Sequence, residues 1–186
     1  MRHHVAYNYV GRPRSFVIDT LFHYDDTPIR VSHDRCSDPV GRTEGGLLVQ
    51  SASAESDTLT TITIGPHGDS RRIYVFWSLV TTGEHFDLLY VPATKALFVG
   101  GGSHSATIDT DSMSIVQQND IMLFWAFERR RDFILELGEV DCFLYDLNGN
   151  LLDEAPVDPP YEINETDGGI NLISTVMGSQ WLTFPQ

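Results

Sequence analysis

Residues of the types that form a nucleophilic triad gather in one short stretch of the chain. They are Ser103, His104, Asp109 and Asp111. A serine activated by a histidine base, which a carboxylate orients, attacks acyl carbons in many hydrolases. Triads are assembled from distant segments, however, and the G-x-S-x-G turn that presents a nucleophilic serine is missing. The spacing favours a protein that is not an enzyme, with a small hydrolase as the alternative.

A second stretch resembles the start of a calcium-binding loop. Asp146, Asn148 and Asn150 place side-chain oxygens at alternate positions. A calcium loop needs glycine at its sixth position and glutamate at its twelfth, whereas Gly149 is the fourth residue here and Val157 the twelfth. A hairpin turn explains the same residues without a metal, so we expect no metal site and no cofactor.

Glycine and cysteine positions also indicate structural roles. Gly100–Gly102 match neither a P-loop nor a dinucleotide-binding loop, which favours a bend or a close backbone approach at a strand end. Cys36 and Cys142 are too few for a disulfide framework and are expected to be small core residues.

The remaining pattern predicts an all-β fold. Short runs of Val, Ile, Phe, Tyr and Thr alternate with Gly, Pro, Asn and Asp, which is typical of antiparallel hairpins with little helix. We expect a β-sandwich or a few packed blade-like sheets in a single domain of residues 1–186, with a loop boundary near 32–46. The expected hairpins join residues 87–91 to 96–99, 104–108 to 113–116, 143–147 to 150–153, 161–164 to 170–173, and 174–177 to 181–184.

Three local features refine this expectation. Asn148-Gly149 predicts a two-residue type I′ turn. Residues 122–127 are apolar on both faces, which predicts a central strand covered on both sides. Residues 128–132 carry three arginines between two acids and predict a solvated turn.

Charge limits the classes of partner. The 186 residues carry a net charge of −14, and residues 132–186 hold 11 acidic residues and no Lys or Arg. Such a surface repels phosphates, so nucleic acid and anionic membranes are not expected partners. Without a long apolar run or a leader-like N-terminus, the sequence predicts a cytoplasmic protein.

The order of motifs in the second half resembles an uncharacterised bacterial β-rich family with propeller-blade-like repeats. The motifs are Gly100-Gly-Gly102, Phe124-Trp125, Asp146-Leu-Asn-Gly149, Pro159-Pro-Tyr161, Met177-Gly178 and Phe184-Pro185. The resemblance extends to immunity proteins of toxin systems, and it implies a protein that binds and neutralises a toxin.

Charge and resemblance together predict a binding function. A cytosolic inhibitor or immunity protein would bind a basic toxin or effector through its acidic C-terminal surface. The candidate contacts are Glu136, Glu139, Asp141, Asp153, Glu154, Asp158, Tyr161, Glu162 and Trp181. Two alternatives remain: the acids only confer solubility, or the protein is a β-sandwich module that binds a small ligand or carbohydrate through exposed aromatic side chains. Of the tryptophans, Trp77 and Trp125 are expected in the core, and the sequence leaves the oligomeric state open.

Overall fold

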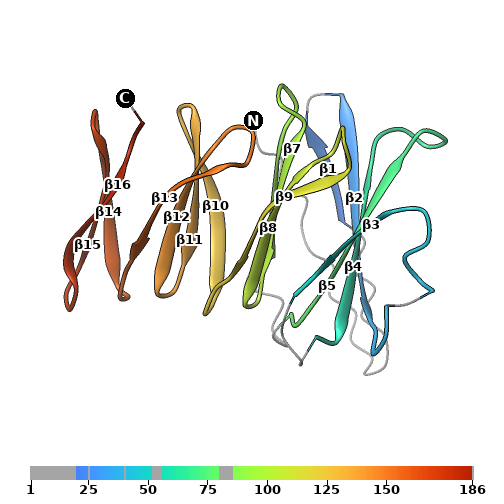
Figure 1. Ribbon diagram of the computed structural model, residues 1–186, viewed down its shortest axis with the longest axis horizontal. Helices are drawn as coiled ribbons and strands as arrows, with labels where there is room; N and C mark the ends of the chain where they lie inside the picture. Colours follow the sequence, from blue (N-terminus) through green and yellow to red (C-terminus); the bar gives the residue numbers. More distant parts are fainter. Residues whose placement is uncertain (1–19, 25, 40, 52–55, 80–85, 186) are drawn as a thin grey trace. The chain divides into compact units, whose positions relative to one another are not determined.

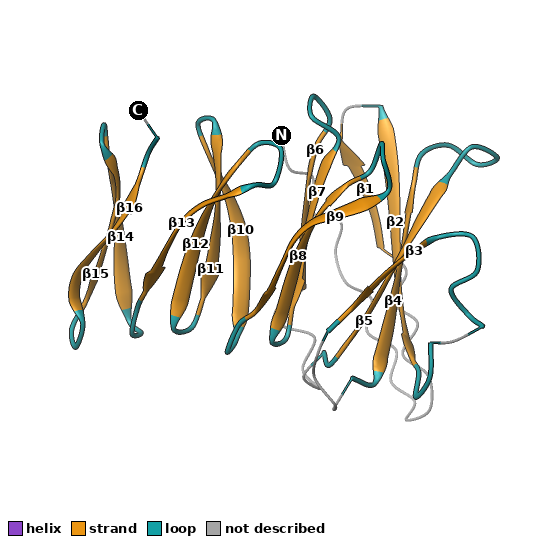
Figure 2. Ribbon diagram, viewed as in Figure 1, coloured by secondary structure: helices purple, strands orange, loops and turns teal. Residues whose placement is uncertain are grey.

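The computed structural model describes residues 20–24, 26–39, 41–51, 56–79 and 86–185, and these residues form strands and turns without a helix (Figures 1 and 2). The strands are β1 (Thr20–Tyr24), β2 (Thr27–Arg35), β3 (Leu47–Gln50), β4 (Thr58–Ile64), β5 (Arg71–Trp77), β6 (Phe86–Val91), β7 (Ala96–Gly101), β8 (His104–Asp109), β9 (Ser114–Asp120), β10 (Phe124–Arg130), β11 (Phe133–Gly138), β12 (Asp141–Asp146), β13 (Leu151–Pro156), β14 (Tyr161–Thr166), β15 (Gly169–Ser174) and β16 (Gly178–Thr183). The all-β prediction is confirmed.

The chain divides into two compact units, between Leu79 and Val80. Unit 1 contains one five-stranded sheet of order β1-β2-β4-β5-β3. Neighbouring strands of this sheet are antiparallel, except that β3 and β5 run parallel. The sequence did not predict this parallel pair. Ser32–Arg35 belong to β2, so the suggested boundary at 32–46 falls inside unit 1. The expectation of a single domain stays a prediction.

Unit 2 consists of three successive blade-like antiparallel sheets. Blade 1 has the order β6-β7-β8-β9, blade 2 the order β10-β11-β12-β13, and blade 3 the order β14-β15-β16. In each blade the strands follow one another through short turns, so neighbours in the sequence are neighbours in the sheet.

Apolar residues on both faces of blade 2 hold the three blades together. One face packs Phe127, Ile134 and Tyr145 against blade 1 residues that include Phe98. The other face packs residues such as Leu144 against blade 3. Fully burying one such side chain contributes about 1.5–3 kcal/mol. This double coverage explains why β11 and β12 are apolar on both faces.

A glycine at position 100 permits the close packing of blades 1 and 2. A Cβ atom on Gly100 would lie 2.3 Å from the ring of Phe124, so the ring occupies the space that a larger residue would fill. The close approach predicted for the glycine run is therefore confirmed at this residue.

Two expectations about the turns are wrong. Only Gly149 of the Asn148-Gly149 pair has a positive φ, and its N–H bonds to the carbonyl of Asp146, so the turn is not type I′. The last hairpin is shifted, because residues 175–177 are its turn and β15 pairs with β16. The other four hairpins form as predicted.

The strand expected at residues 122–127 is also placed differently. β10 begins at Phe124 and is the first strand of its sheet, with a partner on one side, whereas Met122 is 66% exposed. Its apolar pattern reflects packing between blades and not a central position in a sheet.

Cys36 and Cys142 are free and buried, as expected. Over the described residues no helix meets the length and apolarity needed to span a membrane.

Candidate functional site

Several of the predicted partner contacts lie at one end of unit 2. Because each blade is an antiparallel meander, every second turn lies at the same end, which is the lower end of β6 to β16 in Figure 1. We call this surface the acidic end. It comprises residues 102–103, 121–123, 139–140, 157–160 and 175–177, with the adjoining strand residues Asp141 and Glu162.

Backbone hydrogen bonds connect successive turns of the acidic end. They run from the N–H of Ile121 to the carbonyl of Ser103 (3.0 Å), from Phe124 to Gly102 (2.8 Å), from Glu139 to Leu123 (2.8 Å) and from Val157 to Val140 (2.8 Å). These bonds tie blade 1 to blade 2 and each connection to the next. Four of the five turns are therefore joined by backbone hydrogen bonds, and residues 175–177 are the turn for which no such bond is seen among the described residues.

Four carboxylates of this end are available to a partner. Glu139, Asp141 and Asp158 are partly exposed and Glu162 is exposed. Within the described part of the chain, none of the four makes a side-chain hydrogen bond or ion pair. Among the described residues no Lys or Arg side chain compensates their charges.

Apolar side chains lie among these acids. Met122, Val176 and Met177 are 66%, 78% and 41% exposed, and all three belong to turns of the acidic end. Exposed apolar side chains beside charged ones are typical of protein-binding surfaces, where the apolar atoms provide contact area and the charges orient the partner.

The basic residues of unit 2 lie at the opposite end. Among residues 86–185 they are Lys95, in the β6–β7 turn, Arg129 and Arg130, which end β10, and Arg131, in the turn that follows. Arg131 Nε lies 2.9 Å from Glu165 Oε1, and the guanidinium also lies 3.9 Å from Asp167. The turn predicted at 128–132 is shorter in the structure, because residues 128–130 belong to β10 and only residues 131–132 form the turn. Arg130 pairs with Glu128 of the same end. The Lys and Arg residues of the described part of unit 2 are therefore confined to one end of its strands.

Three other predicted contacts lie on the strands of blades 2 and 3. Asp153 accepts the N–H of Thr183 at 2.7 Å, so its carboxylate links β13 to β16. Glu154 is exposed on β13, and Trp181 is 50% exposed on β16. These residues are accessible but do not belong to the acidic end.

Tyr161, another predicted partner contact, also has a structural role, because it joins two blades. Its hydroxyl donates to the carbonyl of Gly138 at 2.9 Å, and its ring stacks on Trp125 with centroids 5.3 Å apart. These contacts join blade 3 to blade 2. Trp77 is fully buried and Trp125 partly buried, which leaves Trp181 as the exposed tryptophan.

Glu136 was predicted as a partner contact, and this prediction is wrong. The residue is 0% exposed and points between blades 1 and 2, where Tyr145 Oη donates to its Oε2 at 2.6 Å. Its other oxygen, Oε1, has no hydrogen-bond partner among the described residues. Burial raises its pKa to about 7, although hydrogen bonds with Ser105, Tyr145 and Asn119 act in the opposite direction. A surface partner cannot reach this carboxyl group.

The triad-like residues do not converge. His104 and Asp109 are the two ends of β8, and Asp109 accepts the N–H of Asp111 within its own turn. His104 is 2% exposed and its Nδ1 lies 3.1 Å from Asp120 Oδ1. Burial lowers the pKa of His104, with Asp120 opposing the shift. The sequence did not predict this pair because His104 and Asp120 come from different strands. The contact with Asp120 holds the imidazole inside the blade.

The remaining chemical candidates give no assembled site. Both carboxylate oxygens of Asp146 accept hydrogen bonds from Asn148 and Asn150, so this loop is satisfied internally. His67 is exposed in the β4–β5 turn, and His85 lies outside the described residues. No group of three metal-ligating side chains occurs in the described ranges.

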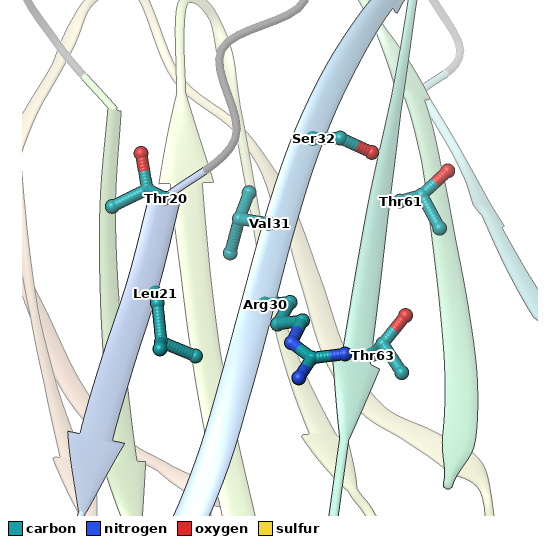
Figure 3. Close-up of a pocket in the computed structure, with 7 residues that line it drawn as sticks. All are labelled: Thr20, Leu21, Arg30, Val31, Ser32, Thr61 and Thr63. Carbon is teal, nitrogen blue, oxygen red and sulfur yellow. The ribbon is translucent and has the colours of Figure 1, made fainter. Parts of the chain in front are cut away.

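A hollow of about 390 Å³ lies on the sheet of unit 1 (Figure 3). Its lining comes from β1, β2 and β4: Thr20, Leu21, Arg30, Val31, Ser32, Thr61 and Thr63. It offers hydroxyl groups and one guanidinium, but its lining contains no nucleophile paired with a base. It therefore resembles a shallow polar depression more than a catalytic pocket.

No family model matches the sequence, and the search of curated proteins found no match. Solved structures do match. BamB from Moraxella catarrhalis matches at 8% identity, TM-score 0.43, over 91% of this chain and 44% of its own. The β-propeller domain of the Trilobed protease from Pyrococcus furiosus matches at 9% identity, TM-score 0.48, over 91% and 53%. Apo AztD from Citrobacter koseri matches at 11% identity, TM-score 0.38, over 84% and 53%.

The chain thus spans about half the length of the solved structures it matches.

Proposed function

We propose that the protein binds a basic protein at the acidic end of unit 2 and thereby inhibits it, as an immunity protein inhibits a toxin or effector. One observation carries the proposal: the acidic end combines carboxylates that lack internal partners with exposed Met122, Val176 and Met177. The cations of the described blades lie at the other end. A nucleic-acid-targeting toxin has a basic active site, which such a surface would cover.

The proposal requires no chemistry from this chain. Association would be fast and salt-dependent, because complementary charge steers encounter and salt screens it. The exposed apolar side chains would supply contact area that salt does not weaken. The acids at the opposite end, which face their own arginines, would contribute less.

The first experiment co-expresses the protein with the product of the adjacent reading frame. The proposal expects that product to arrest growth alone and to be silenced by this protein. If the neighbour is harmless, or remains toxic in the presence of this protein, the immunity role is wrong.

The second experiment compares two charge-matched double variants. Glu139→Gln with Asp158→Asn removes two charges from the acidic end, and Asp132→Asn with Asp167→Asn removes two from the opposite end. At about 0.2–1 kcal/mol for each exposed charge pair, the first double weakens binding to the purified neighbour roughly 2- to 30-fold. The control double has a smaller effect, and equal effects of the two would contradict the placement of the interface.

A further inference from the structure

The third blade ends in an open sheet edge. Blades 1 and 2 each contain four strands, whereas blade 3 contains three, and β16 has a strand neighbour on one side only among the described residues (Figure 2). An edge strand presents backbone N–H and C=O groups that can bond to another extended chain.

The contacts of Thr183 show which groups of β16 point outward. Its N–H donates to Asp153 and not to β15, although Thr183 faces Gly169 in the register. Hydrogen-bonded and non-bonded pairs alternate along an antiparallel ladder, so Ser179 and Trp181 have the same orientation as Thr183. Their N–H and C=O groups point away from β15, and Asp153 occupies only the last outward N–H of the strand.

β16 lacks the features that normally protect a sheet edge. Its residues Gly178–Thr183 include no charged residue and no proline, and its pairing with β15 is regular. The other edge strands of the blades differ: β6 contains Asp87, β14 contains Glu162 and Glu165, and β9, β10 and β13 each carry a charged residue and take part in an irregular pairing. Charges and bulges discourage unwanted strand addition, and β16 itself contains neither of them.

The surroundings of β16 indicate what kind of segment fits it. Trp181 and Ile173 are 50% and 39% exposed, and their places in the register, Trp181 opposite Asn171 and Ile173 opposite Ser179, put them on one face of blade 3. No Lys or Arg follows Arg131, whereas acids are frequent there. The strand also begins at the turn 175–177, which is part of the acidic end. A basic partner bound to the acidic end could therefore place an extended segment of its chain along β16.

We propose that β16 is a strand-addition site, at which an extended basic segment of the partner pairs with Ser179 and Trp181 as a fourth strand of blade 3. The inference rests on the proposed function, because it specifies how the same basic partner is held. Backbone hydrogen bonds supply the pairing, and Trp181 covers the side chains of the added strand on one face. Glu162, which is opposite Ile173 in the register and therefore on the same face, selects lysine and arginine.

The test uses the whole chain with a short synthetic peptide of alternating lysine and valine as the probe. A second peptide of the same sequence has its bonding amides N-methylated, and a third replaces lysine with glutamate. Binding is followed by Trp181 fluorescence and by hydrogen exchange of the Ser179 and Trp181 amides. The lysine peptide should slow exchange at both amides, and the methylated peptide should bind at least about tenfold more weakly, since it loses the ladder hydrogen bonds.

One substitution and a matched control test the edge itself. Ser179→Pro removes an outward N–H without removing a bond to β15, a position at which edge strands tolerate proline. Ser179→Ala keeps the N–H and removes only the hydroxyl, which donates to Asn171 Oδ1 at 2.6 Å. The proline variant should lose peptide binding and the alanine variant should retain it, with the far-ultraviolet spectrum checking that both fold.

Several results would overturn the inference. They are equal binding of the methylated peptide, equal binding of the glutamate peptide, unchanged binding by the proline variant, or a dimer of this chain that the proline variant dissociates. The last result would show that a second copy occupies the edge. Peptide binding is measured without the partner, so its failure is distinct from failure of the co-expression and charge-variant experiments that test the proposed function.

Discussion

Replacing Glu136 by glutamine should remove a large pH dependence of stability. In the folded protein the carboxyl group is 0% exposed, and burial raises its pKa from 4.5 to about 7. In the unfolded chain the group is in water and has its ordinary pKa. The folded state therefore holds a proton on Glu136 over a pH range in which the unfolded state has lost it.

The size of the effect follows from the difference between the two pKa values. Raising the pKa from 4.5 to about 7 is a shift of about 2.5 units, and each unit corresponds to about 1.4 kcal/mol. Because the folded pKa is the higher one, the stabilising effect of the neutral group is complete below pH 4.5. It is lost as the pH rises through 7, and the total loss is about 3 kcal/mol in the free energy of unfolding.

The assay compares wild type and Glu136→Gln by denaturant unfolding between pH 5 and pH 8. The comparison is needed because other groups titrate in this range: burial lowers the pKa of His33 to about 4, which makes stability rise with pH up to about 6.5. The His33 contribution is common to both proteins and cancels. The variant should be close to wild type at pH 5 and more stable by up to about 3 kcal/mol at pH 8.

A difference between the two proteins that does not change with pH would refute the reasoning. Tyr145→Phe supplies an independent check, since it removes the hydroxyl that donates to Glu136 at 2.6 Å. Without that bond the ionised carboxylate is less stable, so the pKa of Glu136 should rise further. The loss of stability should still begin near pH 4.5 but continue to a higher pH and become larger.

Two further predictions concern the packing and turns of the blades. Gly100→Ala would place a Cβ 2.3 Å from the Phe124 ring and should lower the free energy of unfolding by about 1–3 kcal/mol, measured by denaturant titration; an unchanged midpoint would show that the ring moves without cost. Asp146→Ala removes the acceptor for Asn148 and Asn150 and should cost about 1–2 kcal/mol, with faster amide exchange at both residues; unchanged exchange would mean that the turn does not depend on the carboxylate.

Much of the fold was predictable because strands and turns leave local signals. Pro92 and Lys95 mark the β6–β7 turn, and Asp146 with Gly149 marks the β12–β13 turn, although its type was wrong. The last hairpin was misplaced because residues 174–177 have the composition of a strand, whereas their conformation is set by the pairing of β15 with β16. The parallel β3–β5 pair joins segments that no local signal connects.

The site was less predictable because exposure is a tertiary property. The sequence established a run of acids without bases, but it did not distinguish Glu136, inside the blade interface, from Glu139, three residues later in a turn. The one local sign was that Glu136 interrupts an apolar strand.

The sequence by itself determined the β-strand content, the positions of most turns and the acidity of the last third, because these depend on residue type and near neighbours. Only the tertiary structure decided which acids reach solvent, since Glu136 is covered by residues as distant as Ser105 and Asn119. It also decided that alternate turns lie at one end and that β16 is an edge strand among the described residues. These properties arise from contacts between strands that are far apart in the chain, which the local sequence does not encode.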